Sequence, residues 1–181
     1  MTVEYLKLMK EIWTKPRVTF DGRFARIAEA GGTRPHPAQR PHIPIWIGGH
    51  SAAALRRVVE VADGWHPLGL RPPVKLYPAE MTAAVRRLRD MAAAAGRDPK
   101  SITITFKAPL KFDPAAGRDR TPLSGSPAQI AEDLAAYVAA GVEHVVLDFS
   151  VPTVPEMLDV LEQVAADVRP RGSRSAPSPL V

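Results

Sequence analysis

The sequence contains no cysteine. This absence excludes disulfide bridges, cysteine–zinc sites and thiol nucleophiles, so any chemistry must come from other side chains. Long apolar runs are absent too. No window approaches the roughly 18 residues of a membrane span, and the charged N-terminal residues do not resemble the apolar segment of a secretory signal. We therefore expect a cytoplasmic protein with no membrane partner.

A clustered basic surface is also missing. The formal net charge is +5, but three of the positive charges lie in an acid-free C-terminal tail, at Arg169, Arg171 and Arg174. Elsewhere lysine and arginine alternate with acidic residues, without the basic stripe and interleaved aromatic residues of a nucleic-acid groove. The charge pattern therefore argues against a nucleic-acid partner.

Several catalytic signatures are absent as well. The chain has no Walker loop, no GxGxxG motif, and no nucleophile elbow with serine, histidine and aspartate in order. No HxxxH spacing joins a histidine pair to carboxylates. We therefore expect no metal site, and the sequence indicates neither a hydrolase nor a kinase.

The composition is that of one globular domain, with 181 residues, of which 45% are hydrophobic and 24% charged. Apolar residues at helical spacing predict an amphipathic helix over 2–13. The stretch "RVTFDGRFARI" alternates apolar and polar residues on both sides of Asp21-Gly22, which predicts a β-hairpin that turns at this dipeptide. The Pro- and Gly-rich stretch that follows predicts a surface loop.

From Ile43 onward one pattern repeats: an apolar strand, a loop, and a helix. The strand segments are "PIWIG" (44–48), "DGWHP" (63–67), "SITITFKAPL" (101–110) and "EHVVLDFS" (143–150), with a longer loop at 111–125. One helix is predicted from Ser51 to Ala62, and a second over 78–95, with Met81, Val85, Leu88 and Ala92 on one face and Gly96 as the stop. Two more begin with capping boxes, Ser126 with Gln129 and Thr153 with Glu156, and are predicted to end at Gly141 and at Arg169-Pro170. The last helix is expected to bury a stripe of Leu158, Leu161, Ala165 and Val168.

Four strand–helix units in strict alternation predict an α/β fold with a parallel sheet and helical crossovers. The strands "PIWIG" and "HVVLDF" are nearly continuous apolar runs, as expected where both faces of a sheet are covered. Four units can form a small open sheet or half of an eightfold barrel, and periodicity alone does not choose between them.

The first candidate site is Gly48-Gly49-His50-Ser51, at the carboxyl end of a predicted strand, where ligands of parallel α/β folds bind. Two glycines let the backbone approach an anion, and the helix capped by Ser51 offers unpaired N–H groups and the positive end of its dipole. A phosphate can therefore bind there. The alternative is that the glycines only make a tight turn and Ser51 only caps the helix.

Other candidates follow the same strand-end rule, and each has a structural alternative. Trp65 can line a flat cofactor or pack the mouth of the fold, and His50 and His66 can act as hydrogen-bond donors or acid–base groups. Asp148 can face a ligand or cap a turn, and Lys107 can pair with an anion or extend to solvent. The remaining histidines, His36, His42 and His144, are expected to be structural or solvated.

As a set, these segments resemble the carboxyl-terminal half of the bacterial luciferase-like monooxygenase family, in particular its probable coenzyme F420-dependent oxidoreductases. The resemblance rests on four motifs in the same order, "IWTKPRVTFDGRFARI", "RPHPAQRPHIPIWIGGHSAAALRRVVEVADGWHPLG", "AGRDPKSITIT" and "LSGSPAQIAEDLAAYVAAGVEHVVLDF". It covers about residues 2–170.

The resemblance implies a (β/α)8 TIM barrel, to which residues 1–170 contribute about four β/α units after the N-terminal helix and hairpin. The composition of residues 171–181 predicts a disordered tail. It also implies a cofactor, F420 or alternatively FMN, at the carboxyl mouth. Its phosphate-bearing tail is expected on Ile47, Gly48, Gly49, His50 and Ser51, with Gly64 and Trp65 lining the pocket beside them. The 19 prolines and the excess of arginine over lysine fit a GC-rich source and favour F420.

Such relatives carry about four more units before the segment matching Tyr5, and with them most of the catalytic groups. We therefore expect the phosphate end of the cofactor site in this chain and not its catalytic end. A half barrel exposes two strand edges, which predicts pairing with another copy as a homodimer. The expected function is hydride transfer or oxygen insertion on a small organic substrate. The alternatives are a non-catalytic flavin-binding protein and a dimerising module without a ligand.

Overall fold

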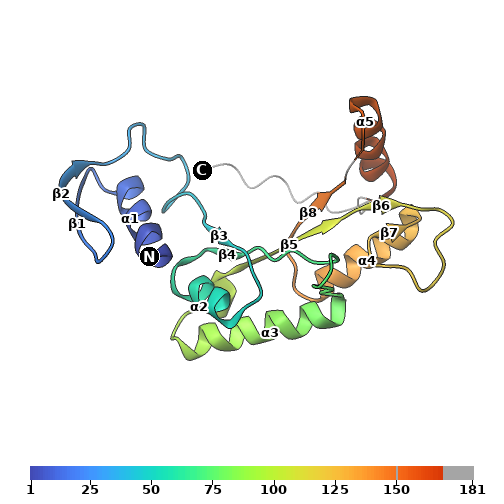
Figure 1. Cartoon of the computed structure of the whole chain (residues 1–181), viewed down its shortest axis with the longest axis horizontal. Coiled ribbons are helices and arrows are strands. Elements are labelled where there is room, and N and C mark those ends of the chain that lie inside the picture. Colours follow the sequence, from blue (N-terminus) through green and yellow to red (C-terminus); the bar gives the residue numbers. More distant parts are fainter. Residues whose placement is uncertain (150, 169–181) are drawn as a thin grey trace.

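A four-stranded parallel sheet forms the centre of the computed structural model, which describes residues 1–149 and 151–168 (Figure 1). The strand order is β3-β4-β5-β8, with bounds Trp46–Ile47, Gly64–Trp65, Thr103–Pro109 and His144–Asp148. Trp46 lies opposite Gly64, and Thr105 lies opposite His144. The parallel sheet predicted from the alternating pattern is confirmed, although the first two strands are only two residues long.

The sheet curls so that its two edge strands approach each other on one face. The rings of Trp46 on β3 and His144 on β8 lie 5.3 Å apart between centroids, although two strands separate β3 from β8. In a flat sheet three strand spacings would separate these strands by about 14 Å. Trp46 and His144 therefore mark a concave face, as the wall of a barrel requires.

Each strand of the sheet is followed by a helix, and the bounds of the first three helices agree with the predicted ones to within a few residues. α2 (Ala52–Val61), α3 (Pro78–Ala94), α4 (Pro127–Ala139) and α5 (Val154–Gln163) follow β3, β4, β5 and β8 in turn. Ser126 and Thr153 cap their helices as predicted, with Gln129 and Glu156 completing the boxes. Gly96 and Gly141 follow α3 and α4 at positive φ, which satisfies the helix ends.

The core lies between the convex face of the sheet and α2, α3 and α4. Phe106 of β5 packs against Tyr137 of α4 with 4.5 Å between ring centroids, and both side chains are fully buried. The predicted face of α3, Met81, Val85, Leu88 and Ala92, is buried in the same cluster. Each such side chain contributes about 1.5–3 kcal/mol on burial, so these helices are fixed chiefly by their apolar faces.

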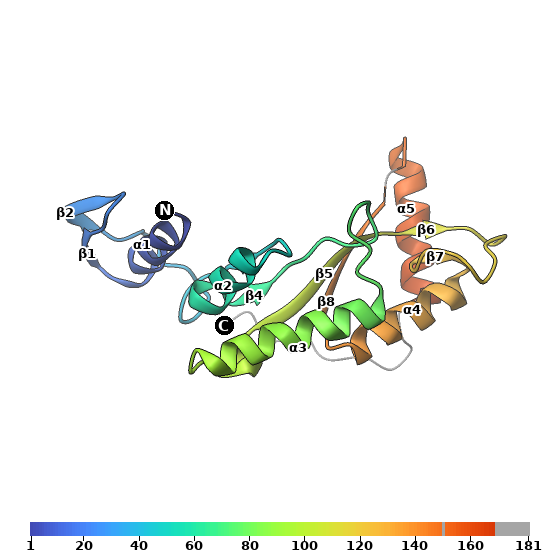
Figure 2. The same cartoon turned by 60° about the horizontal axis from the view of Figure 1, so that its bottom comes forward.

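A smaller unit precedes the sheet and consists of α1 (Thr2–Thr14), β1 (Arg17–Asp21) and β2 (Arg26–Gly31). Figures 1 and 2 both show it beyond the β3 side of the molecule. Asp63 ties it to the sheet, because its carboxylate accepts from the Ile45 N–H at 2.8 Å and lies 3.5 Å from the Lys10 ammonium.

The hairpin was predicted to turn at Asp21-Gly22, and that prediction is wrong. The Gly22 N–H donates to the Ala25 carbonyl, so a four-residue loop joins β1 to β2 and Phe24 lies in the loop. The cause is a distant residue: the Glu4 carboxylate on α1 accepts from the N–H groups of Phe24 and Ala25 at 2.7 and 2.9 Å. A two-residue turn at Asp21-Gly22 would lose both of these hydrogen bonds to Glu4.

The last strand–helix unit also differs from its prediction. Of the stripe expected to be buried on the last helix, Leu158, Leu161 and Ala165 are exposed and only Val168 is buried. The chain from Val164 to Val168 forms a π-helical turn. β8 is half-buried along most of its length, so it is not covered on both faces as predicted. Among the described residues, no strand pairs with its outer edge.

Two further segments differ from the predicted loops. The loop expected at 111–125 contains a short parallel pair, β6 (Lys111–Phe112) and β7 (Ser124–Gly125), and a 3-10 turn covers Pro99–Ser101. The helix end at Arg169-Pro170 and the tail at 171–181 lie outside the described residues. Within the described ranges, no helix combines the length and the apolar character needed to cross a membrane.

Candidate functional site

The loop from Gly48 to Ser51 follows β3 directly and lies at the carboxyl end of the sheet. Gly49 has φ +94°, a left-handed conformation that glycine adopts without strain. A Cβ on Gly48 would lie 3.1 Å from the His66 carbonyl oxygen, and one on Gly49 would lie 3.1 Å from the Ala54 Cβ. Both glycines therefore allow close packing of the loop against its neighbours.

Ser51 caps the helix that follows, as predicted. Its Oγ accepts from the Ala54 N–H at 3.1 Å, and its carbonyl accepts from the Leu55 N–H. Among the hydrogen bonds of residues 1–149 and 151–168, none uses the backbone N–H of Gly49, His50 or Ser51 as a donor. The loop thus presents backbone donors at the positive end of the α2 dipole.

Trp65 holds this loop from behind. Its side chain is 1% exposed and belongs to the hydrophobic core, and its indole Nε1 donates to the Gly49 carbonyl at 2.9 Å. The His50 ring meets the Trp65 ring edge-on, with 6.3 Å between centroids. The tryptophan thus fixes the Gly49 peptide and packs in the core, which is the structural role weighed for it from the sequence.

Gly64 makes room for the aromatic side chain of the neighbouring strand. A Cβ at Gly64 would lie 2.6 Å from Trp46 Cδ1, so any other residue would displace the indole. With Gly64 in place, the Trp46 ring extends across β4 and stacks on the His66 ring at 5.8 Å. Together with the contact to His144, this forms an aromatic cluster on the concave face.

His66 is oriented by a buried threonine. Its Nδ1 lies 2.6 Å from the Thr105 Oγ1, and the same hydroxyl donates to the Trp65 carbonyl at 3.0 Å. Because Thr105 is fully buried and has a single proton to donate, its oxygen accepts from the His66 Nδ1–H. Burial lowers the pKa of His66, and the charges of Lys107 and His144 lower it further. The neutral ring therefore carries its proton on Nδ1, leaving Nε2 as an acceptor.

Lys107 and Asp148, predicted separately as strand-end candidates, are brought together by the structure. The Lys107 ammonium lies 3.7 Å from the Asp148 carboxylate, which also accepts from the Arg71 guanidinium at 2.5 Å. Arg71 was not predicted from the sequence. Two cations share one carboxylate, so this corner of the sheet carries a net positive charge beside the carboxyl ends of β5 and β8.

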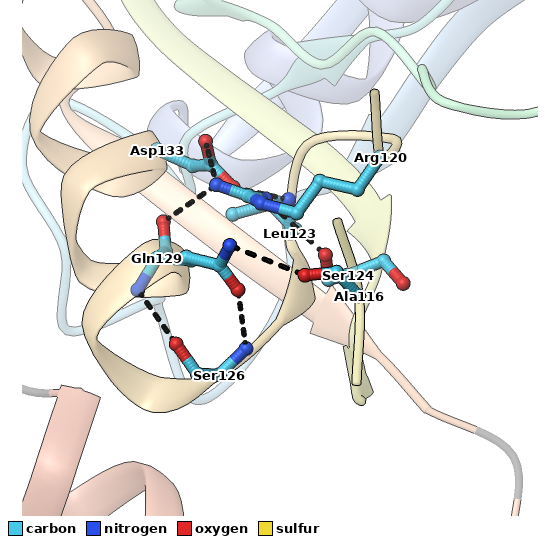
Figure 3. A network of polar contacts seen from close by, with 7 residues as sticks. All are labelled: Ala116, Arg120, Leu123, Ser124, Ser126, Gln129 and Asp133. Carbon is cyan, nitrogen blue, oxygen red and sulfur yellow. Dashed lines mark hydrogen bonds and ion pairs between the residues drawn. The ribbon is translucent and has the colours of Figure 1, made fainter. Parts of the chain in front are cut away.

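A polar network fixes the loop between β5 and α4 (Figure 3). The Arg120 guanidinium and the Asp133 carboxylate form a two-point ion pair, and both side chains are largely buried, at 13% and 16% exposed. Asp133 also accepts from the Leu123 N–H at 2.7 Å, which holds Leu123 at φ +61°. A leucine at positive φ is strained, so the network compensates for that strain. These contacts fix the loop at the carboxyl end of β5.

The structure places the predicted site residues in two groups. Gly48, Gly49, His50 and Ser51 form one loop, with Ile47 at the end of β3 before it and Trp65 at the end of β4 bonded to it. His66, Lys107 and Asp148 lie on or beside the concave face. Thr105, Trp46, Arg71 and Asp133 were missed. Within the described chain, no three histidine or acidic side chains gather in a way that would hold a metal ion.

The model of the luciferase-like monooxygenase family matches residues 1–114. This chain belongs to that family. An uncharacterized protein of Mycobacterium tuberculosis strain H37Rv is 33% identical over an alignment of 147 residues, and the match covers 76% of this chain and 48% of that protein. The F420-dependent glucose-6-phosphate dehydrogenase of Nakamurella multipartita is 33% identical over 110 residues, covering 61% of this chain and 30% of the relative. The chain thus spans about half the length, or less, of these curated relatives.

Two solved enzyme structures share the fold. An F420-dependent secondary alcohol dehydrogenase, solved with an F420–acetone adduct, superposes with a TM-score of 0.70 at 16% identity, over 94% of this chain and 62% of that one. A riboflavin lyase, solved with modified FMN and riboflavin, gives 0.69 at 13% identity, over 91% and 55%. The four β/α units therefore have the fold of part of a luciferase-like TIM barrel, as the resemblance implied.

Proposed function

We propose that this chain provides the phosphate-binding part of an oxidoreductase that uses the deazaflavin F420. Ile47, Gly48, Gly49, His50 and Ser51 would hold the cofactor phosphate. Trp65 would fix the loop through its bond to the Gly49 carbonyl, and Gly64 would make room for Trp46 beside it. The proposal rests on one observation above all: the N–H groups of Gly49, His50 and Ser51 have no acceptor in the described protein and lie before the Ser51-capped N-terminus of α2.

The donor set fits a phosphate and not a metal ion. Backbone N–H groups and a helix N-terminus attract anions, and each such interaction contributes about 0.3–1 kcal/mol even without a lysine. The left-handed Gly49 lets the loop present these donors without a side chain in the way. The Trp65 indole holds the Gly49 peptide in place before any ligand binds, which reduces the entropy lost on binding.

The cofactor would supply hydride transfer, and the residues of this chain would orient it and exclude water. Trp46 and His66 cover the concave face beside the carboxyl ends, and His66 presents an acceptor nitrogen there. Two cations that share the Asp148 carboxylate, Lys107 and Arg71, contribute positive charge at the same end of β5 and β8. These groups would line the path of a small organic substrate.

F420 is favoured because F420-dependent enzymes occur both among the curated relatives and among the structural neighbours. FMN is the alternative cofactor, since a neighbour solved with modified FMN shares the fold and FMN also carries a phosphate. With FMN the reaction class would extend to oxygen insertion.

The experiment is a titration of the purified chain with F420 and, separately, with FMN, following the quenching of cofactor fluorescence. We expect F420 to bind at micromolar concentrations and more tightly than FMN. Tighter binding of FMN would replace F420 in the proposal. Saturable binding without turnover under any substrate would support a flavin-binding protein without catalysis, and no binding of either cofactor would overturn the proposal.

A further inference from the structure

The segment between β4 and α3 runs alongside β5 and ends in a tight loop, residues 70–77 (Figures 1 and 2). Within this loop the Leu70 N–H donates to the Lys75 carbonyl at 2.8 Å. The 70–77 loop follows β4, as the Gly48–Ser51 loop follows β3, and the carboxyl ends of neighbouring parallel strands meet at one edge of a sheet. The 70–77 loop therefore lies at the end of the sheet where ligands of α/β folds bind.

Two leucines anchor the 70–77 loop in the hydrophobic core. Leu70 and Leu76 are each 8% exposed, and both have positive φ, at +56° and +52°. The Leu76 carbonyl accepts from the buried Tyr137 hydroxyl at 3.1 Å. A leucine keeps this strained conformation only where its surroundings hold it there. The core therefore sets the conformation of the loop before any ligand binds.

A hollow of about 270 Å³ opens over the 70–77 loop. Apolar groups line most of it, among them Leu70, Pro72, Val74 and the Tyr77 side chain. The loop after β5 contributes Thr121, and none of the lining residues belongs to the edge strands β3 and β8. Pockets for drug-sized ligands have volumes of about 300–1,000 Å³, so this hollow suits a smaller molecule.

The hollow is positively charged. Arg71 and Lys75 both line it, whereas no acidic side chain of the described residues does. Asp148 pairs with the Arg71 guanidinium from outside the lining, but it also lies 3.7 Å from the Lys107 ammonium, so these three groups keep a net positive charge. The Lys75 ammonium lies 6.0 Å from the Tyr77 ring centroid, which places a cation beside an apolar wall.

We propose that this hollow binds a small organic acid, whose carboxylate pairs with Arg71 and Lys75 and whose apolar body contacts Pro72 and Val74. Guanidinium groups bind carboxylates through charge-assisted hydrogen bonds. An inorganic anion would leave the apolar walls in water, and a neutral apolar molecule would leave both cations without a partner. The lining shares no residue with the Gly48–Ser51 loop, so this is a second binding site.

The first test is a titration of the purified chain with benzoate, followed by the NMR shifts of the backbone amides. Benzoate carries one carboxylate on a flat apolar body. We expect saturable shifts in the 70–77 loop and at Thr121, with a dissociation constant on the order of 1 mM, as suits a ligand of so few atoms.

Two comparison ligands separate the charge from the apolar body. Benzamide has the shape of benzoate without its charge, and inorganic phosphate has charge without an apolar body. At the 70–77 loop each should bind at least about fivefold more weakly than benzoate. Shifts that phosphate causes at Gly48–Ser51 report the other site and do not enter this comparison.

Two variants test the cations one at a time. Arg71→Gln and Lys75→Gln should each raise the dissociation constant for benzoate about threefold or more, because each removes one exposed charge partner. Lys111→Gln is the matched control. The Lys111 side chain is exposed and does not line the hollow, so this variant should bind benzoate as the wild type does. Amide shifts outside the loop show that each variant remains folded.

An absence of saturable shifts in the 70–77 loop up to about 50 mM benzoate would overturn the proposal. Equal affinities for benzoate and benzamide would refute the role of the charge, and phosphate binding there as tightly as benzoate would refute the role of the apolar walls. Unchanged affinity in both the Arg71 and the Lys75 variant would also contradict it. None of these measurements needs a cofactor, so a failure of the chain to bind F420 would leave this proposal standing.

Discussion

The indole N–H of Trp65 donates to the backbone carbonyl of Gly49, with 2.9 Å between nitrogen and oxygen. The two residues are 16 positions apart: Gly49 lies in the loop after β3, and Trp65 is the last residue of β4. This bond connects the hydrophobic core to the loop that we propose to hold a phosphate. The loop is therefore preorganised by the fold.

Trp65→Phe removes the donor and keeps most of the ring. The Gly49 carbonyl then loses its partner, which should lower the free energy of unfolding by about 1–2 kcal/mol. The freed loop should also bind F420 several-fold more weakly, because its order is lost before binding. Urea denaturation and fluorescence titration measure the two effects. Trp13→Phe on α1 is the control and should leave F420 affinity unchanged. An unaltered affinity in Trp65→Phe would show that the bond has no part in binding.

The lowered pKa of His66 predicts that stability depends on pH. Burial, Lys107 and His144 lower its pKa in the folded chain, whereas in the unfolded chain it stays near its ordinary value of about 6.5. Protons therefore bind more tightly to the unfolded chain, and stability falls as the pH drops below about 6.5. The free energy of unfolding, measured by denaturation from pH 7 to pH 5, should fall less steeply in His66→Asn.

Asparagine suits this substitution because its amide can still donate to Thr105 from near the Nδ1 position. The difference between wild type and variant isolates His66 from the other histidines. Equal slopes for both proteins would contradict the account. Nitrogen chemical shifts of the His66 ring give an independent check, since a neutral ring bonded to Thr105 should show its proton on Nδ1.

The buried ion pair of Arg120 and Asp133 should contribute strongly to stability. Asp133→Ala leaves a largely buried guanidinium and the Leu123 N–H without their carboxylate, which should cost about 3 kcal/mol in unfolding free energy. Asp113→Ala is the control. Its partner Lys111 is exposed, so the loss should stay below about 1 kcal/mol. Equal losses in the two variants would mean that burial of the pair does not matter.

Local signals in the sequence predicted the elements whose causes are local. Ser126 with Gln129, and Thr153 with Glu156, lie three residues apart, and both capping boxes formed. Gly49 was expected at a tight turn, and it has the positive φ that such a turn needs. The parallel sheet followed from strict alternation alone, since parallel strands need crossovers.

Residues whose role depends on distant partners could not be predicted in this way. Glu4 reshapes a loop 20 residues away, Asp133 fixes Leu123, and Thr105 orients His66 from another strand. No spacing rule links such pairs before the fold is known. The prediction that Leu158 is buried failed for a different reason. Helical periodicity identifies an apolar stripe, but it does not say what covers that stripe.

The central claim is that the Gly48–Ser51 loop holds an anionic group of the cofactor. Gly49→Asp and Gly49→Asn test it most directly, because the two variants share shape and backbone strain and differ in charge. A carboxylate about 4 Å from a phosphate costs up to about 4 kcal/mol near a protein surface. We predict that the dissociation constant for F420 is at least about tenfold higher in Gly49→Asp than in Gly49→Asn. Equal dissociation constants in the two variants would contradict the claim.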